Sequence, residues 1–404
     1  MVQASPFLQR IAVRRTNEPG VFEGMLPPLS MGNVRPIAYG GFAIATGIVA
    51  AGHTIPTHTR FVPYSILGHF LGPGSIDVPF VCQVSSIRDT RTFATRSVIV
   101  KQRVRGKRGE AQLRNVLSIT LDMIASPRSD PAYMEEAKKH HVDVSCVGSL
   151  LRYDPAPSWK IDEPNEHSET PDTYFSRRLQ EGTLDKQSIG IYNKIIGLWH
   201  QIFDTVAVPS SMMLQNLLGM VNIPTSQDHL TMTDRRSFDW MRIHDALPCA
   251  TGTEPAHGTS ETKDMLPISP VMAHAATMAF ALDGALAFAP LSLGKKSMLD
   301  ASAASTLDFA TRFHSDVLDM NQYLLREIRP IQAGWQRTYS EARLFDTNGH
   351  LVATCTQQGV LRPVQEGAMA TPADPPHYAP TPKLENKDVH NLFTPAATLP
   401  SRSA

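Results

Sequence analysis

Residues 270–290 read PVMAHAATMAFALDGALAFAP, and this stretch decides the fold of the C-terminal half. It is apolar on nearly every side, which is typical of a helix packed inside a protein. We therefore predict one buried helix from Pro270 to Pro290.

Asp283 is the only formally charged side chain between Asp264 and Lys295. A buried carboxylate is costly unless something hydrogen-bonds to it or its charge is used. This makes Asp283 a candidate functional residue. The alternative is a helix that surfaces near Asp283-Gly284 and leaves the carboxylate in water.

A second stretch of the same kind runs from Tyr39 to His53 with no charge inside. Each apolar stretch is followed by β-branched or alternating segments that turn residues separate, which predicts strands. A long helix with about five antiparallel strands, occurring twice, indicates an α+β fold. The predicted strands are Arg60–Leu71, Val78–Ile87, Thr92–Gln102 and Gln112–Ile124, then Met298–Phe313, Gln322–Ile331, Arg337–Asp346 and Leu351–Leu361.

Short motifs in both halves carry a resemblance to a known family. They include Val21-Phe-Glu-Gly24, Tyr39-Gly-Gly41, Phe70-Leu-Gly-Pro-Gly74, Ala281-Leu-Asp-Gly284, Ser305-Thr-Leu-Asp308 and the segment from Asp346 to Arg362. In their order and spacing they resemble the acyl-CoA thioesterase II family. The resemblance implies a tandem (double) hot-dog fold, in which two antiparallel sheets each wrap around a long central helix.

This resemblance suggests four parts of the chain. Residues 1–125 and 236–363 would be the N-terminal and C-terminal hot-dog domains. Residues 126–235 would be a connector with Pro-rich segments and helices over Thr173–Gly182 and Ile189–Val206. Residues 364–404 are rich in Pro, Ala and Thr without periodicity, which predicts a disordered tail.

The family hydrolyses thioesters with an Asp, a Thr or Ser, and a Gln that together hold a water molecule. The residues of this sequence that resemble them by motif are Asp283, Thr306 and Gln357. The resemblance also implies acyl-CoA as the substrate and no metal or organic cofactor. Strand alternation would place Thr306 and Asp308 on one face, and Gln357 on the inner face of its own strand. Asp308 is the rival for the carboxylate role.

Substrate-binding residues are expected at two further places. Backbone N–H groups at the start of the first helix, near Gly41, could stabilise the developing oxyanion. The basic run from Lys101 to Arg108 falls at a predicted hairpin, where Arg105 and Lys107 could hold the phosphates of coenzyme A. The alternative for this run is a solvated loop.

The sequence departs from the family pattern where the acyl chain and the pocket wall would lie. Phe42 follows the Gly-Gly pair where the family usually has Gln, and Phe309 follows Asp308 where it usually has His. These changes fit an enzyme specialised for a secondary-metabolite acyl group, such as a polyketide or toxin precursor. They also fit a non-catalytic acyl-binding protein, although retention of Asp283, Thr306 and Gln357 argues against this alternative.

A hot-dog hydratase or dehydratase is a further alternative. That family needs an Asp-x-x-Pro-x-His context, and the segment from Asp308 to His314 has neither the proline nor the spacing.

Composition excludes several other classes. Lys plus Arg equals Asp plus Glu, 38 each, which argues against a nucleic-acid partner. No run is long enough for a membrane span, and the four cysteines show no metal-ligand spacing. A cytoplasmic protein is expected; the resemblance also allows a peroxisome, although the C-terminus lacks Ser-Lys-Leu. A homo-oligomer is compatible with the resemblance.

Overall fold

The computed structural model describes residues 2–364, except 33–35, 57–59, 106–109, 127, 129–130, 143–146 and 148. Apart from Val364, the predicted tail lies outside these residues.

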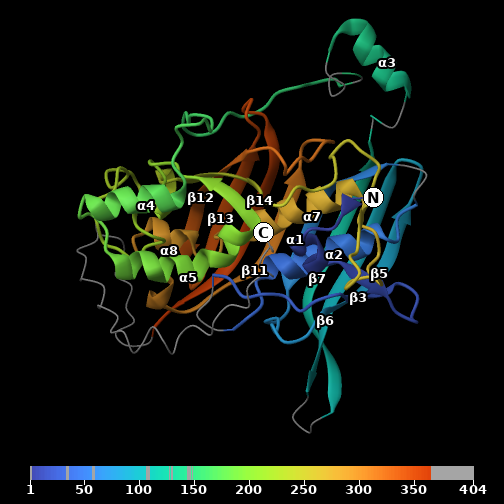
Figure 1. The fold of residues 1–404 in the computed structure, drawn as a ribbon, viewed down its shortest axis with the longest axis horizontal. Helices are drawn as coiled ribbons and strands as arrows, with labels where there is room; N and C mark the ends of the chain where they lie inside the picture. Colours follow the sequence, from blue (N-terminus) through green and yellow to red (C-terminus); the bar gives the residue numbers. More distant parts are fainter. Residues whose placement is uncertain are drawn as a thin grey trace.

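One antiparallel sheet of 12 strands runs through the molecule, in the order β2-β3-β5-β6-β7-β4-β11-β14-β13-β12-β9-β8 (Figure 1). The strands of the N-terminal half are β2 (Val13–Arg15), β3 (Val21–Gly24), β4 (Phe61–Phe70), β5 (Phe80–Asp89), β6 (Phe93–Arg105) and β7 (Ala111–Ala125). Those that follow are β8 (Phe203–Val206), β9 (Ser237–Ile243), β11 (Ala301–Phe313), β12 (Leu324–Gly334), β13 (Arg337–Phe345) and β14 (Leu351–Pro363). All eight predicted strands are confirmed within a few residues.

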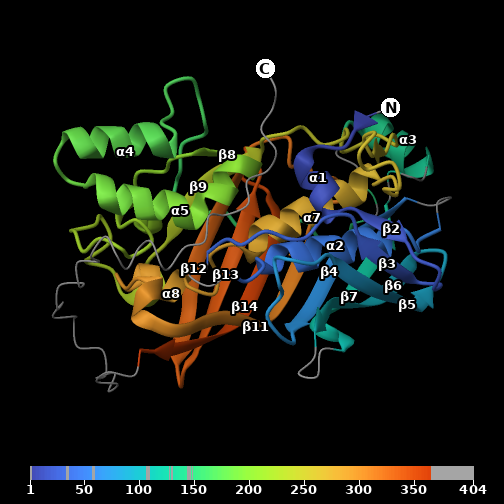
Figure 2. The same cartoon turned by 60° about the horizontal axis from the view of Figure 1, so that its bottom comes forward.

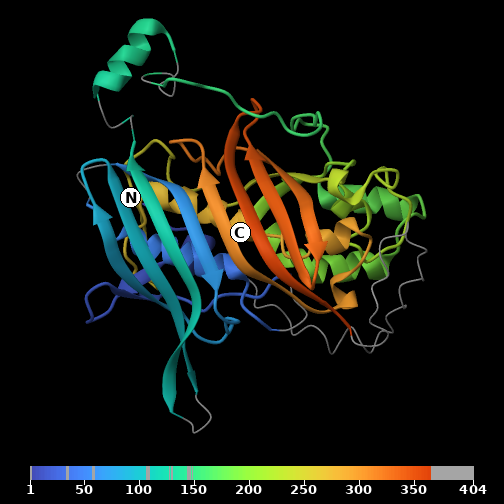
Figure 3. The same ribbon diagram turned by 180° about the vertical axis from the view of Figure 1, so that it is seen from behind.

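The two predicted sheets are joined edge to edge. Strand β4 of the first half pairs antiparallel with β11 of the second, with Gly68 opposite Phe309. Figure 3 shows this continuous sheet from the side opposite to that of Figure 1.

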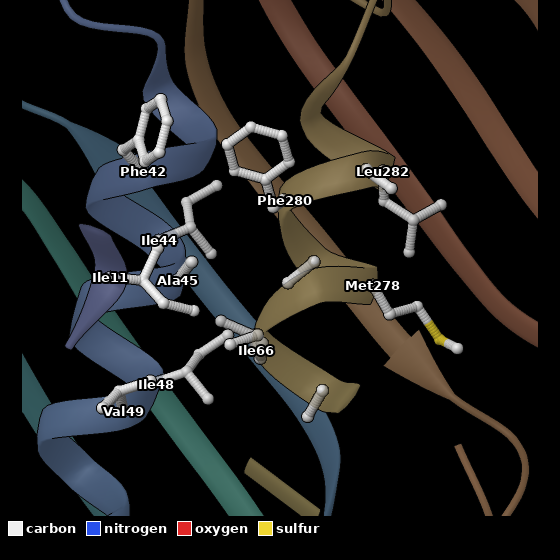
Figure 4. Close-up of a cluster of buried hydrophobic side chains, with 14 of the residues drawn as sticks. Ile11, Phe42, Ile44, Ala45, Ile48, Val49, Ile66, Met278, Phe280 and Leu282 are labelled. Carbon is white, nitrogen blue, oxygen red and sulfur yellow. The ribbon is translucent and has the colours of Figure 1, made fainter. Parts of the chain in front are cut away.

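The two apolar stretches form helices α2 (Gly40–Gly52) and α7 (Pro270–Asp283), which lie side by side against one face of the sheet (Figure 2). Phe42 and Phe280 meet edge to face between them, with ring centroids 4.9 Å apart (Figure 4). Helix α1 (Pro6–Ile11) adds Phe7, whose ring lies 5.0 Å from that of Phe280. Both long helices are apolar all round because they contact the sheet, each other and this cover.

The predicted end of the second apolar helix is wrong. Helix α7 ends at Asp283, where Gly284 takes an extended backbone conformation, and a separate short helix, α8 (Ala289–Leu293), follows. Helix α1 ends at Ile11, and Val13–Arg15 pairs with β3 as strand β2. Strand β9 was not predicted.

The predicted connector contains helices α3 (Pro131–His140), α4 (Pro171–Gln180) and α5 (Lys186–Ile202). The last four residues of the helix expected over Ile189–Val206 instead form β8, which pairs with β9 at the sheet edge. Their sequence, Phe-Asp-Thr-Val, is rich in strand-forming residues. The remaining short elements are β1 (Val2–Gln3), β10 (Ala256–His257), α6 (Met212–Gln215) and the 3₁₀ turns Met232–Asp234 and Met298–Asp300. In the part of the chain that the structure describes, no helix is long and apolar enough to cross a membrane.

Candidate active site

Asp283 is the last residue of α7, yet only 8% of its surface is exposed. The helix therefore ends where one alternative placed its end, but the carboxylate does not reach bulk water. The end of the helix is covered by Trp199 of α5 and Arg326 of β12, because a Cβ built on Gly284 would lie 2.9 Å from each.

Hydrogen bonds join the three residues expected to hold the water. The Gln357 Nε2 donates to Asp283 Oδ1 at 2.7 Å, and the Thr306 hydroxyl donates to Gln357 Oε1 at 3.0 Å. Gln357 is 1% exposed, so its amide has no competing partner from solvent. The chain of bonds fixes the amide with its donor side toward the carboxylate.

A β-bulge in β11 decides which side chains reach this site. Thr306 lies opposite Gly359, but Asp308 lies opposite Gln358 and Phe309 opposite Gln357, so Leu307 is an extra residue. An extra residue reverses the alternation of side chains beyond it. The prediction that Thr306 and Asp308 share a face is therefore wrong. Asp308 lies on the outer face of the sheet, away from Asp283.

Burial raises the pKa of Asp283 to about 6, against the lowering effects of hydrogen bonds from the Gln357 side chain and the Gly41 backbone N–H. Gly41 lies in the first turn of α2, so the N-terminal half supplies a donor and the positive end of a helix dipole. Gly40 must lack a side chain, since a Cβ there would lie 2.9 Å from Asp283 Oδ2 and 2.7 Å from the Phe70 ring.

Two residues that the sequence did not single out hold the last turn of α7. The Tyr39 hydroxyl donates to the Phe280 carbonyl at 2.7 Å. Arg326 donates to the Ala281 carbonyl at 2.9 Å and the Gly284 carbonyl at 3.3 Å, and forms two bonds of 2.9 and 2.8 Å with Asp239. Carbonyls at a helix end need external donors. The available signal was the charged pair Arg326-Glu327 between Leu325 and Ile328 of β12.

A cavity of about 590 Å³ opens onto Asp283 and Thr306. Its wall comes from both halves and from the connector, and it is mainly apolar. Representative lining residues are Gly40, Phe70, Ile196, Trp199, Leu218 and Phe288. Gln357 and Gly41 lie behind this wall and contact the carboxylate, not the cavity.

The remaining expected residues have the following positions. Lys107 lies outside the described residues, and Arg105 ends β6 with a side chain that is likewise not described. Asp308 and His314 of the hydratase alternative do not line the cavity. Within the described ranges, no cluster of His, Cys, Asp or Glu could hold a metal ion.

Each half of the chain matches the model of a known protein domain. Residues 27–124 match the acyl-CoA thioesterase N-terminal domain and residues 222–361 match the acyl-CoA thioesterase C-terminal domain, which together make up more than half of the chain. The chain belongs to the acyl-CoA thioesterase family. The predicted family is thus confirmed, and this acyl-CoA thioesterase is a thioester hydrolase, contrary to the non-catalytic alternative.

Solved structures confirm the fold of this acyl-CoA thioesterase. An acyl-CoA thioesterase II, TesB2, from Mycobacterium marinum is 17% identical, with a TM-score of 0.53 over 89% of this chain and 98% of that one. A protein of unknown function with a hot dog fold from Alicyclobacillus acidocaldarius is 14% identical, with a TM-score of 0.51 over 89% and 100%. A comparison with curated proteins gives no match.

Proposed function

We propose that this acyl-CoA thioesterase hydrolyses its substrate by direct attack of a water molecule that the bonded set Asp283, Thr306 and Gln357 holds. Asp283 and Thr306 lie on the cavity wall and can contact the water, and Gln357 lies behind them and positions both. The observation that supports this most strongly is the bonded chain from Thr306 through Gln357 to a buried carboxylate on the cavity wall. A thiol-release assay with a panel of acyl-CoAs tests it, because each turnover frees one molecule of coenzyme A.

Each group has one role in this mechanism. Asp283 accepts a proton from the water while the water oxygen bonds to the thioester carbon. The C–S bond then breaks, and the departing thiolate is protonated to give coenzyme A. A thioester is already activated, so water needs a base and an orientation more than it needs a covalent nucleophile. The Thr306 oxygen keeps lone pairs that can accept from the water, because its proton is donated to Gln357.

The pH dependence follows from the carboxylate. Only ionised Asp283 can accept a proton, so kcat/KM should fall below a pH of about 6, the pKa that burial gives this group. A profile of kcat/KM from pH 4 to pH 9, measured by thiol release, checks this. A profile that stays flat down to pH 4 would contradict the assignment.

Gln357→Leu should move that profile to higher pH. The Gln357 amide lowers the pKa of Asp283 by donating to it, so removing the amide should raise the pKa further. The matched control is Gln358→Leu on the neighbouring, outward position of β14, which should leave the profile in place. An unshifted profile for Gln357→Leu would show that the amide does not act on the base.

The family indicates an acyl-CoA substrate, and we propose that the acyl group is a specialised one. Each of the two residues packs on an aromatic residue of the cavity wall: Phe309 on Phe70, with ring centroids 5.8 Å apart, and Phe42 on Tyr39, with ring centroids 6.3 Å apart. Both departures from the family pattern thus lie close to the pocket. Phosphate binding by Arg105 and Lys107 and the boundaries of the four predicted parts are likewise proposals. For Gly41 we propose a role in bonding to Asp283 through its backbone N–H, in place of the expected oxyanion role.

A further inference from the structure

Helix α5 lines the cavity with one of its faces. Tyr192, Ile196, Trp199 and His200 all border the cavity, and their spacing of four, three and one residues places them on the same side of a helix. This helix belongs to residues 125–221, which neither family domain matches. Part of the pocket is therefore built by a segment outside the matched thioesterase domains.

Tyr192 carries the one hydroxyl among these four residues and is buried, with 6% of its surface exposed. Its ring is fixed by edge-to-face packing on Phe175 at 4.9 Å. Its hydroxyl makes no hydrogen bond to any residue that the structure describes. The few polar groups on the wall of a mainly apolar pocket commonly fix the orientation of its ligand, so this hydroxyl is a candidate contact.

The neighbouring charged groups do not satisfy this hydroxyl. Asp239 and Arg326 also line the cavity, but each bonds to the other at 2.9 and 2.8 Å. His200 also borders the cavity, with its ring centroid 6.4 Å from that of Tyr192, but its Nδ1 lies 3.4 Å from the Thr205 hydroxyl. Ile196, Leu214 and Leu218 of the same wall are apolar. An oxygen atom of a bound molecule is the partner that this arrangement lacks.

We propose that the cavity takes an acyl chain with a hydroxyl or keto oxygen at a carbon remote from the thioester, and that the Tyr192 hydroxyl hydrogen-bonds to this oxygen. The inference rests on the proposed function, since it names the acyl group of that reaction. A site built to bond a substrate oxygen discriminates against the analogue without it, because the protein group is then left unpaired.

The test compares decanoyl-CoA with a series of hydroxydecanoyl-CoAs that carry the hydroxyl at successive carbons from the third to the last. For the wild-type enzyme, kcat/KM should be highest at one position in the series and exceed that for decanoyl-CoA by about tenfold or more. Tyr192→Phe should lower kcat/KM for that substrate by about tenfold to a hundredfold. The loss for decanoyl-CoA should be much smaller, because its acyl chain carries no oxygen for the hydroxyl to bond.

Tyr174→Phe is the matched control, because Tyr174 is another buried tyrosine packed on Phe175 but does not line the cavity. It should keep the wild-type preference. Equal preference along the whole series in the wild type, or an equal loss on all substrates in Tyr192→Phe, would overturn the inference.

A binding measurement separates this inference from the proposed function. Calorimetry of the wild type and Tyr192→Phe with the free hydroxydecanoic acids and decanoic acid needs no hydrolysis. Tighter binding of one hydroxy acid by the wild type alone would support the inference even if no acyl-CoA were hydrolysed. Hydrolysis of decanoyl-CoA without any such preference would refute the inference alone.

Discussion

Asp283→Asn should lower kcat/KM for acyl-CoA hydrolysis by about 10²–10⁴-fold, the range expected when a general base is lost. Asparagine has nearly the same shape and can still bond to Gln357, but its amide cannot accept the proton of the water. Thiol release with the best substrate of the panel is the measurement. Normal turnover in this variant would refute the role of Asp283.

Asp308→Asn is the matched control, because it makes the same change on the outer face of β11. It should retain activity close to that of the wild type.

The stability of Asp283→Asn gives an independent check that its fold is intact. The pKa of Asp283 in the folded protein, about 6, lies above its ordinary value of 3.8, so the folded state binds this proton more tightly than the unfolded state. The stability that this group contributes is therefore lost as pH rises from about 4 to about 6. At pH 8 the free energy of unfolding of the Asn variant should equal that of the wild type or exceed it, by no more than about 3 kcal/mol.

Arg326→Met should lower the free energy of unfolding by about 3 kcal/mol. The variant leaves Asp239 without its partner and removes the donor to two carbonyls at the end of α7. Methionine keeps much of the side-chain volume that packs on Trp199, where the guanidinium carbon now lies 4.3 Å from the ring centroid. Urea unfolding monitored by circular dichroism measures the change.

The control is Arg14→Met, which removes an ion pair that is exposed to solvent. Arg14 pairs with Glu23 at 2.8 Å, but its side chain is 48% exposed, so its loss should cost less than about 1 kcal/mol. Equal effects of the two variants would show that Arg326 does not stabilise the helix end. Arg326→Met should also lower kcat, since the same helix end positions Asp283.

The helices, the strands and the family could be predicted because their signals are local. Uncharged apolar runs mark α2 and α7, and alternating β-branched segments mark the strands that surround them. The order of short motifs then identified the family, and with it Asp283, Thr306 and Gln357. The bonded chain of these three residues agrees with that expectation but leaves their roles a proposal.

The features that could not be predicted depend on contacts between distant segments. The bulge at Leu307, which separates Thr306 from Asp308, follows from pairing with β14 and has no signature in β11 itself. Asp283 ends its helix yet stays buried because Trp199 and Arg326 cover Gly284 beside it and Gln357 bonds to it, all from segments far away in sequence. The lining of the cavity by α5 likewise needs the folded chain.

The most direct test of the mechanism is a single turnover in water labelled with ¹⁸O, with enzyme in excess over acyl-CoA. If Asp283 acts as a base on water, the acid product should carry one ¹⁸O atom. The peptide that contains Asp283 should then show no added mass after digestion. Label in the Asp283 carboxylate would mean that it attacked the thioester and formed an anhydride, which would contradict direct hydrolysis by water.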